Sequence, residues 1–177
     1  MNFLRKIGFL CGLGGLLFLT AHPAVAAPPS REALLQALEV TPDQINPVKD
    51  PATGQLSLPP PVSAPTDRDA AVEAAAKLAA DTGDPELIAA LLRYQFAYRS
   101  PENTVPARAL GKVFLEQSDA FLQVYDEQNI LMQVKLFPYL EFGYKAATRG
   151  KNKSIRKYQL TQKKLDRLSA SLMNAGR

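Results

Sequence analysis

The sequence is short of the side chains on which most enzyme active sites depend. Its 177 residues include one cysteine, one histidine and no tryptophan. The cysteine, Cys11, and the histidine, His22, both lie within the first 26 positions. A chain without that segment forms no disulfide, no Cys–His or Ser–His–Asp catalytic system and no Cys/His zinc site. We therefore expect no cofactor and no bound metal, and we expect binding rather than catalysis from the remainder.

The first 26 residues have the three parts of a secretory signal peptide. Arg5 and Lys6 give a positive start, residues 7–20 form an apolar run, and Ala24-Val25-Ala26 provides a small-x-small cleavage site. Cleavage after Ala26 would place the mature protein in the periplasm or outside the cell. The apolar run has 14 residues, whereas a stable bilayer anchor needs about 20. The alternative is an uncleaved chain that is anchored in the inner membrane through residues 7–20.

Proline divides the remaining 151 residues into two parts. Residues 47–65 contain six prolines, including the run Pro59-Pro60-Pro61. Because proline fixes φ and lacks a backbone N–H, this stretch is expected to be an extended, polyproline II-like linker. The linker is either a spacer or a docking site for a proline-binding partner. We predict an N-terminal arm and Pro-rich linker, partly disordered, over 27–65, and a single helical domain with a basic C-terminal segment over 66–177.

Helix signals recur throughout the mature chain. Six residues can cap the start of a helix: Ser30, Thr41, Thr66, Asp84, Thr104 and Thr161. Each is followed by a proline, by acidic residues or by apolar residues at helical spacing. Gly83 ends the helix that starts at Thr66, and a second helix starts at once, so the two are expected to form an antiparallel hairpin. The apolar spacing from residue 105 to about residue 128 predicts one amphipathic helix. The predicted fold is a mostly α domain of about four to five helices.

Residues 130–144 fit two kinds of secondary structure. Apolar residues occupy alternate positions from Ile130 to Leu136, which is typical of a strand. The same stretch also fits a helix that is kinked at Pro138, and its Leu, Met, Gln and Lys content favours the helix. The strand interpretation leads to an alternative fold class, α+β with an antiparallel meander at about residues 120–160.

Charge is divided unevenly along the mature chain. Residues 27–142 hold 9 basic and 16 acidic side chains, a net charge of −7, whereas residues 143–177 hold 10 basic and one acidic, a net charge of +9. Eight basic residues fall within 20 positions that contain no acid: Lys145, Arg149, Lys151, Lys153, Arg156, Lys157, Lys163 and Lys164. Such a cluster attracts anions. We expect it to contact an envelope protein or an anionic surface of phospholipid, lipopolysaccharide or cell wall, and we do not expect nucleic acid. The alternative is a solvated face that the acidic part of the chain partly neutralises.

These observations predict an exported, non-catalytic interaction or assembly protein of the bacterial cell envelope. One alternative is a periplasmic carrier of an apolar ligand, in a cavity lined by Phe114, Phe121, Phe137, Tyr139, Phe142 and Tyr144. Another is a hydrolase that uses two carboxylates, for which the chain offers Glu116, Asp119, Asp126, Glu127 and Glu141. No motif singles out one pair of acids, so no catalytic residue is assigned.

Overall fold

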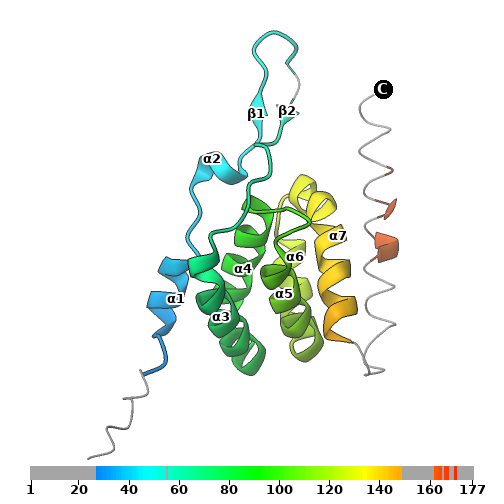
Figure 1. The fold of residues 1–177 in the computed structure, drawn as a ribbon. Coiled ribbons are helices and arrows are strands. Elements are labelled where there is room, and N and C mark those ends of the chain that lie inside the picture. The colour runs from blue at the N-terminus through cyan, green and yellow to red at the C-terminus, as the bar shows by residue number, and fades with distance from the viewer. Residues whose placement is uncertain (1–26, 55, 149–161, 165, 168–169, 171–177) are drawn as a thin grey trace, which may run out of the picture.

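The computed structural model describes residues 27–54, 56–148, 162–164, 166–167 and 170 (Figure 1). Its elements in chain order are α1 (Arg31–Ala37), α2 (Pro42–Ile45), β1 (Val48–Lys49), β2 (Leu56–Ser57), the 3-10 turn η1 (Thr66–Arg68), α3 (Asp69–Thr82), α4 (Pro85–Ala97), α5 (Thr104–Glu116), α6 (Ser118–Asp126) and α7 (Ile130–Ala147). The two short strands pair antiparallel, with Val48 opposite Ser57. The prediction of a mostly helical small domain is confirmed.

Local capping explains where several helices start and end. The Ser30 hydroxyl accepts a hydrogen bond from an amide in the first turn of α1 at 3.2 Å, and Thr41 forms a capping box with Gln44 at α2. The Asp84 carboxylate accepts hydrogen bonds from two amides in the first turn of α4, at 2.9 and 3.2 Å. Gly83 ends α3 with φ +70°, a left-handed conformation that glycine adopts without strain.

Thr66 and Thr104 do not occupy the N-cap positions that the sequence predicts for them. Thr66 opens η1 rather than capping α3 directly. Thr104 is the first residue of α5, and the residue before it, Asn103, takes the N-cap position. The side chain of Asn103 is bound elsewhere, to residues 62, 64 and 98. Thr161, the predicted start of the last helix, lies outside the described residues.

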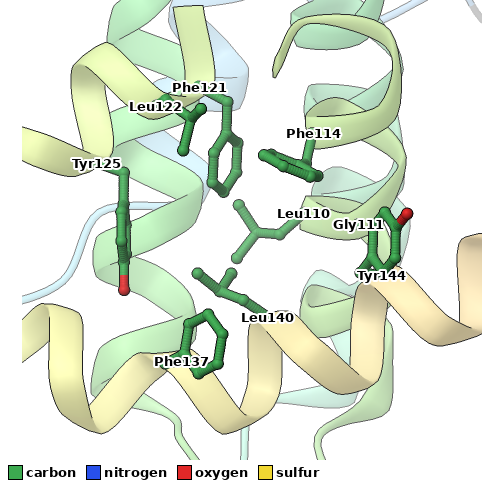
Figure 2. A pocket seen from close by; sticks show the side chains of 9 residues that line it. All are labelled: Leu110, Gly111, Phe114, Phe121, Leu122, Tyr125, Phe137, Leu140 and Tyr144. Carbon is green, nitrogen blue, oxygen red and sulfur yellow. The ribbon is translucent and has the colours of Figure 1, made fainter. Parts of the chain in front are cut away.

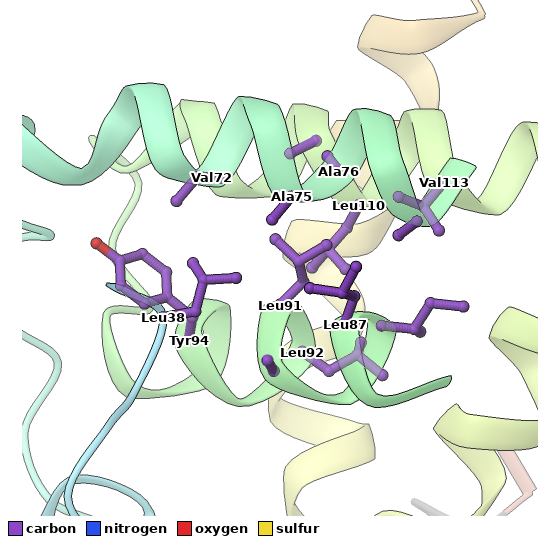
Figure 3. Close-up of a cluster of buried hydrophobic side chains, with 14 of the residues drawn as sticks. Leu38, Val72, Ala75, Ala76, Leu87, Leu91, Leu92, Tyr94, Leu110 and Val113 are labelled. Atoms are coloured by element: carbon purple, nitrogen blue, oxygen red, sulfur yellow. The ribbon is translucent and has the colours of Figure 1, made fainter. Parts of the chain in front are cut away.

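Helices α3, α5 and α7 form one layer, in which α5 contacts both of its neighbours, and α4 and α6 cover one side of that layer (Figure 1). Leu87 and Leu91 of α4 meet Leu110 of α5 in the core between them (Figure 3). The buried face of α3 is made largely of alanine, including Ala75 and Ala79. These small side chains allow α4 and α5 to approach α3 closely, and α3 and α4 pack together as the predicted hairpin.

Residues 130–147 form one helix, so the meander alternative is wrong over this range. The buried side chains of α7 include Leu136, Leu140 and Tyr144, which recur every four residues along one face. Pro138 lies inside the helix on an exposed position, so its ring causes no clash with the core. The predicted single helix from residue 105 to about 128 is also wrong. It is interrupted at Gln117, which has φ −125° and ψ 47° and whose amide Nε2 donates to the Ala80 carbonyl at 2.9 Å.

The segment before residue 66 packs against the helical domain, although the sequence places it in a separate arm. Leu34 of α1 and Leu38, the residue that caps its C-terminus, are 3% and 1% exposed and belong to the core. Arg31 forms an ion pair with Asp84 at 2.5 Å, and Gln44 of α2 donates to the Tyr98 hydroxyl at 3.2 Å. Burial of these two leucines stabilises the packing of this segment on the domain.

Candidate functional site

Three of the eight basic candidates lie in the described residues: Lys145, Lys163 and Lys164. The other five, Arg149, Lys151, Lys153, Arg156 and Lys157, lie outside them. Lys145 pairs with Glu141 one turn earlier in α7, at 2.6 Å. Lys164 pairs with Asp126 at the end of α6, at 2.5 Å, and Lys163 is exposed. Acids of the chain itself therefore partly neutralise two members of the cluster, as the solvated-face alternative expects.

Lys145 also lies in an open hollow of about 430 Å³ between α5 and α7, lined by Thr104, Arg108, Phe142, Lys145 and Ala146. The Arg108 guanidinium is oriented by Thr104, whose hydroxyl accepts from Nη2 at 3.0 Å. Phe142 is 46% exposed and, with Val48, Val62 and Ile130, is one of four exposed large apolar side chains among the described residues. The hollow thus combines two cationic side chains with an exposed aromatic ring near the C-terminal end of α7.

The shape of this hollow depends on the close approach of α5 and α7. Gly111 of α5 and Gly143 of α7 face one another where the two backbones cross. A Cβ on Gly143 would overlap the carbonyl oxygen of Ala107, and a Cβ on Gly111 would overlap that of Gly143. The absence of side chains at both positions brings the cationic residues of α5 and α7 to one surface.

A wider groove of about 790 Å³ adjoins the hollow and crosses α3, α5 and the end of α7. The two share Ala146. Its lining includes six alanines and one leucine, together with five charged residues: Glu73, Lys77, Asp81, Lys112 and Glu116. Because both signs are represented, the groove has no strong preference for the charge of a ligand. The cationic character is concentrated in the hollow.

The five acids considered for catalysis do not form a site in the described part of the chain. Asp126 and Glu141 are each paired with a lysine. Glu116 borders the wide groove, where its neighbours include Lys112. Within the described ranges, no group of three or more Asp, Glu, His or Cys residues could hold a metal ion. Nothing in this arrangement favours the hydrolase alternative.

An apolar cavity of about 20 Å³ lies between α5, α6 and α7 (Figure 2). Of the six aromatic residues predicted to line a carrier cavity, Phe114, Phe121, Phe137 and Tyr144 line it, and Tyr139 and Phe142 do not. The ring of Phe114 packs edge-on against those of Phe121 and Tyr144, with centroids 5.2 and 5.8 Å apart. This volume has room for about one water, whereas ligand pockets usually reach about 300 Å³ or more. The aromatic cluster therefore belongs to the core, and its packing does not favour the carrier alternative.

The sequence did not single out Arg108, which lines the hollow, and it placed Phe142 among residues that line a cavity. The helical register of α7 could have corrected the second point. Phe142 lies two residues beyond Leu140, about 200° around the helix, and so points away from the buried face. Arg108 carries no local signal, since only the packing of α5 on α7 brings it near Lys145.

Buried polar side chains link α6 to α7. The Gln133 amide Nε2 donates to the carbonyls of Tyr125 and Gln128, at 2.8 and 3.0 Å, near the end of α6. The Tyr125 hydroxyl donates in return to the Gln133 carbonyl at 2.7 Å. Burial raises the pKa of Tyr125, which keeps the phenol neutral and able to donate. These contacts join the end of α6 to the first turn of α7 and give both buried side chains hydrogen-bond partners.

Comparison with family models, with curated proteins and with solved structures finds no match to this chain. Across the described ranges, none of the helices combines the length and the apolar character needed to cross a membrane.

Proposed function

We propose that the protein is an exported, non-catalytic binding protein of the bacterial cell envelope. In this proposal, the hollow between α5 and α7 and the basic segment, residues 145–164, together hold an acidic segment of a partner protein. The observation that carries the proposal is the exposed ring of Phe142 in one hollow with Arg108 and Lys145. Exposed aromatic side chains beside arginine are typical of binding surfaces. Arg108 attracts carboxylates, and Lys145 does so when it exchanges its contact with Glu141 for an acid of the partner. The proposal includes no cofactor and no nucleic acid.

The shape of the hollow favours a protein segment over a membrane or cell-wall surface. A hollow of about 430 Å³ between two helices can receive a side chain or a short stretch of chain, whereas a flat anionic surface would meet only its rim. The net charge of +9 over residues 143–177 extends the attraction beyond the hollow. Phospholipid, lipopolysaccharide and cell wall are alternative partners that the experiment below distinguishes.

Export is part of the proposal and has its own measurement. Cleavage after Ala26 predicts a mature protein that starts at Ala27 and is recovered from the periplasm or the medium. The intact mass of the protein purified from each cell fraction shows at which residue the chain starts. Full-length protein in the membrane fraction would favour the anchored alternative through residues 7–20.

The basic segment is tested by removing three charges. Lys151, Lys153 and Lys157 are replaced together by glutamine, and the purified protein is used to capture proteins from an envelope extract. The matched control replaces Lys49, Lys77 and Lys135, three exposed lysines of the other part of the chain, so that both variants lose the same charge. We expect the first triple variant to lose an acidic partner and the control to keep it, with binding that weakens as salt screens the charges.

The hollow is tested by Phe142→Ala and Arg108→Gln, with Ile130→Ala as the control. Ile130 is 43% exposed on the same helix, close to the 46% of Phe142, and does not line the hollow. We expect both hollow variants, and not I130A, to reduce recovery of the same acidic partner. Vesicles of anionic phospholipid, lipopolysaccharide and cell-wall fragments are tested in parallel. Binding to one of these with no protein partner, or unchanged recovery by both hollow variants, would contradict the proposal.

A further inference from the structure

Residues 58–65 are held against the domain through their backbone. They follow β2 and lead into η1. Two side chains from the loop after α4 bind them: Arg99, which is 7% exposed, and Asn103, which is 9% exposed. Arg99 Nη2 donates to the Pro59 carbonyl. Asn103 Nδ2 donates to the Val62 carbonyl at 3.2 Å, and its Oδ1 accepts from the Ala64 amide at 3.0 Å.

The spacing of these contacts matches a polyproline II helix. The two bound carbonyls, of Pro59 and Val62, are three residues apart, and a polyproline II helix has three residues per turn. Both carbonyls therefore face the domain, and the residues between them face away. Pro60 and Pro61 are exposed, and the side chain of Val62 is 46% exposed. The segment thus presents two proline rings and a valine to solvent on a backbone that is already fixed.

The attachment of residues 58–65 uses a buried charge, which a simple spacer does not require. Arg99 is a buried cation, and in the part of the chain that the structure describes no carboxylate forms an ion pair with it. Its other contacts are the Phe96 carbonyl, at 2.8 Å, and the face of the Phe96 ring, 4.7 Å from the guanidinium carbon. Burial of an arginine that binds only carbonyls and a ring costs free energy. Apolar contacts such as that of Leu58 with the core would suffice to tether a spacer.

We propose that Pro60, Pro61 and Val62 form a recognition segment for a partner protein whose binding groove is lined by aromatic side chains. Such grooves recognise polyproline II segments by stacking aromatic rings on proline. A segment whose backbone is already held by Arg99 and Asn103 loses little conformational entropy on binding. This surface uses residues other than those of the basic hollow, so either proposal can fail without the other.

The test places a photo-crosslinking residue, p-benzoylphenylalanine, at position 62 of the full-length protein in cells. Position 48 serves as the control, because Val48 is also exposed, at 59%, and lies in the nearby hairpin. We expect crosslinking from position 62, and not from position 48, to a partner peptide that contains several aromatic residues. A synthetic peptide of residues 57–66, added to extracts, should compete with the crosslink less well than the intact protein does.

Three variants test the cause of the crosslink. Pro60→Ala with Pro61→Ala should lower its yield about tenfold, whereas Pro47→Ala with Pro51→Ala, two exposed prolines outside the segment, should leave it unchanged. Arg99→Met keeps an apolar stem on the Phe96 ring and removes the donors, so it should lower the yield while all prolines remain. Circular dichroism confirms that each variant is folded. No crosslink from position 62, a yield unchanged by the Pro60/Pro61 variant, or a contact peptide without aromatic residues would overturn the proposal.

Discussion

Replacement of Gly143 by alanine tests the close approach of α5 and α7 on which the hollow depends. A Cβ at this position would overlap the carbonyl oxygen of Ala107. That oxygen belongs to the backbone of α5, so no change of rotamer relieves the overlap and one helix has to move. Overpacking that shifts a backbone costs about 1–3 kcal/mol. The shift also loosens contacts around Leu110 and Leu136, which are fully buried on α5 and α7.

Helix propensity acts in the opposite direction. Alanine in a helix interior is more favourable than glycine by about 1 kcal/mol. We expect the overlap to outweigh this gain, because it involves two backbones that cannot relax separately. With an overlap cost of about 2 kcal/mol, the middle of that range, and a propensity gain of about 1 kcal/mol, the net loss in the free energy of unfolding should be about 1 kcal/mol. For a chain of this length, a loss of about 1 kcal/mol lowers Tm by about 2–4 °C.

Urea unfolding at pH 7, followed by the helical circular dichroism signal, measures this loss. Gly111→Ala is a second variant at the same crossing, since its Cβ would overlap the Gly143 carbonyl and lie 2.8 Å from the Tyr144 amide. Ile130→Ala, at an exposed position of the same helix, should change the free energy of unfolding by no more than about 0.5 kcal/mol. A G143A protein as stable as the wild type, or more stable by about 1 kcal/mol as helix propensity alone implies, would refute the packing argument.

Three buried or partly buried polar side chains provide the remaining predictions, all measured by urea unfolding. Tyr125 donates to a carbonyl at 2.7 Å, so Tyr125→Phe should cost about 1 kcal/mol. Tyr94→Phe should leave the free energy of unfolding unchanged or raise it, since the Tyr94 hydroxyl has no partner among the described residues. Equal losses in the free energy of unfolding of Tyr125→Phe and Tyr94→Phe would contradict this reasoning. Burial raises the pKa of Tyr94 to about 12, so the phenol ionises in the unfolded chain first, and the free energy of unfolding is unaffected below pH ~10 and falls as the pH rises towards 12. Tyr94→Phe should therefore lose less stability than the wild type over that range. The Arg31 guanidinium holds the pKa of Asp84 below its usual range, so Asp84 stabilises the fold above pH ~4 and this contribution is lost as the pH falls further. Asp84→Asn, which keeps a capping side chain, should be less stable at pH 7 and less sensitive to acid between pH 7 and pH 3, and an unchanged acid dependence would count against the ion pair.

Helix boundaries that depend on neighbouring residues could be predicted from the sequence. Ser30, Asp84 and Gly83 act through atoms within about one helical turn, so their residue types are informative by themselves. The break at Gln117 could not be predicted in this way. The apolar pattern continues across it, and the residue that fixes it, Ala80, is 37 positions earlier in the chain.

In the Pro-rich segment, too, the local conformation could be predicted from the sequence and the distant contacts could not. Its composition predicts an extended backbone, and residues 58–65 contain no helix or strand. Its attachment depends on Arg99 and Asn103, which follow it by about 40 residues. No local pattern marks these two side chains as its partners, because each sits in a loop whose sequence is unexceptional.

The sequence by itself determined the mostly helical fold, the helix ends that are capped locally and the separation of charge along the chain. It also showed that residues 27–177 contain no cysteine or histidine, which limits their chemistry. These properties follow from composition and from interactions within a few residues. Only the tertiary structure decided that α1 joins the core, that Arg108 shares a hollow with Phe142 and Lys145, and that two exposed prolines are presented on an anchored backbone. The physical reason is that each of these features joins residues more than 30 positions apart, and their contact is set by how the helices pack.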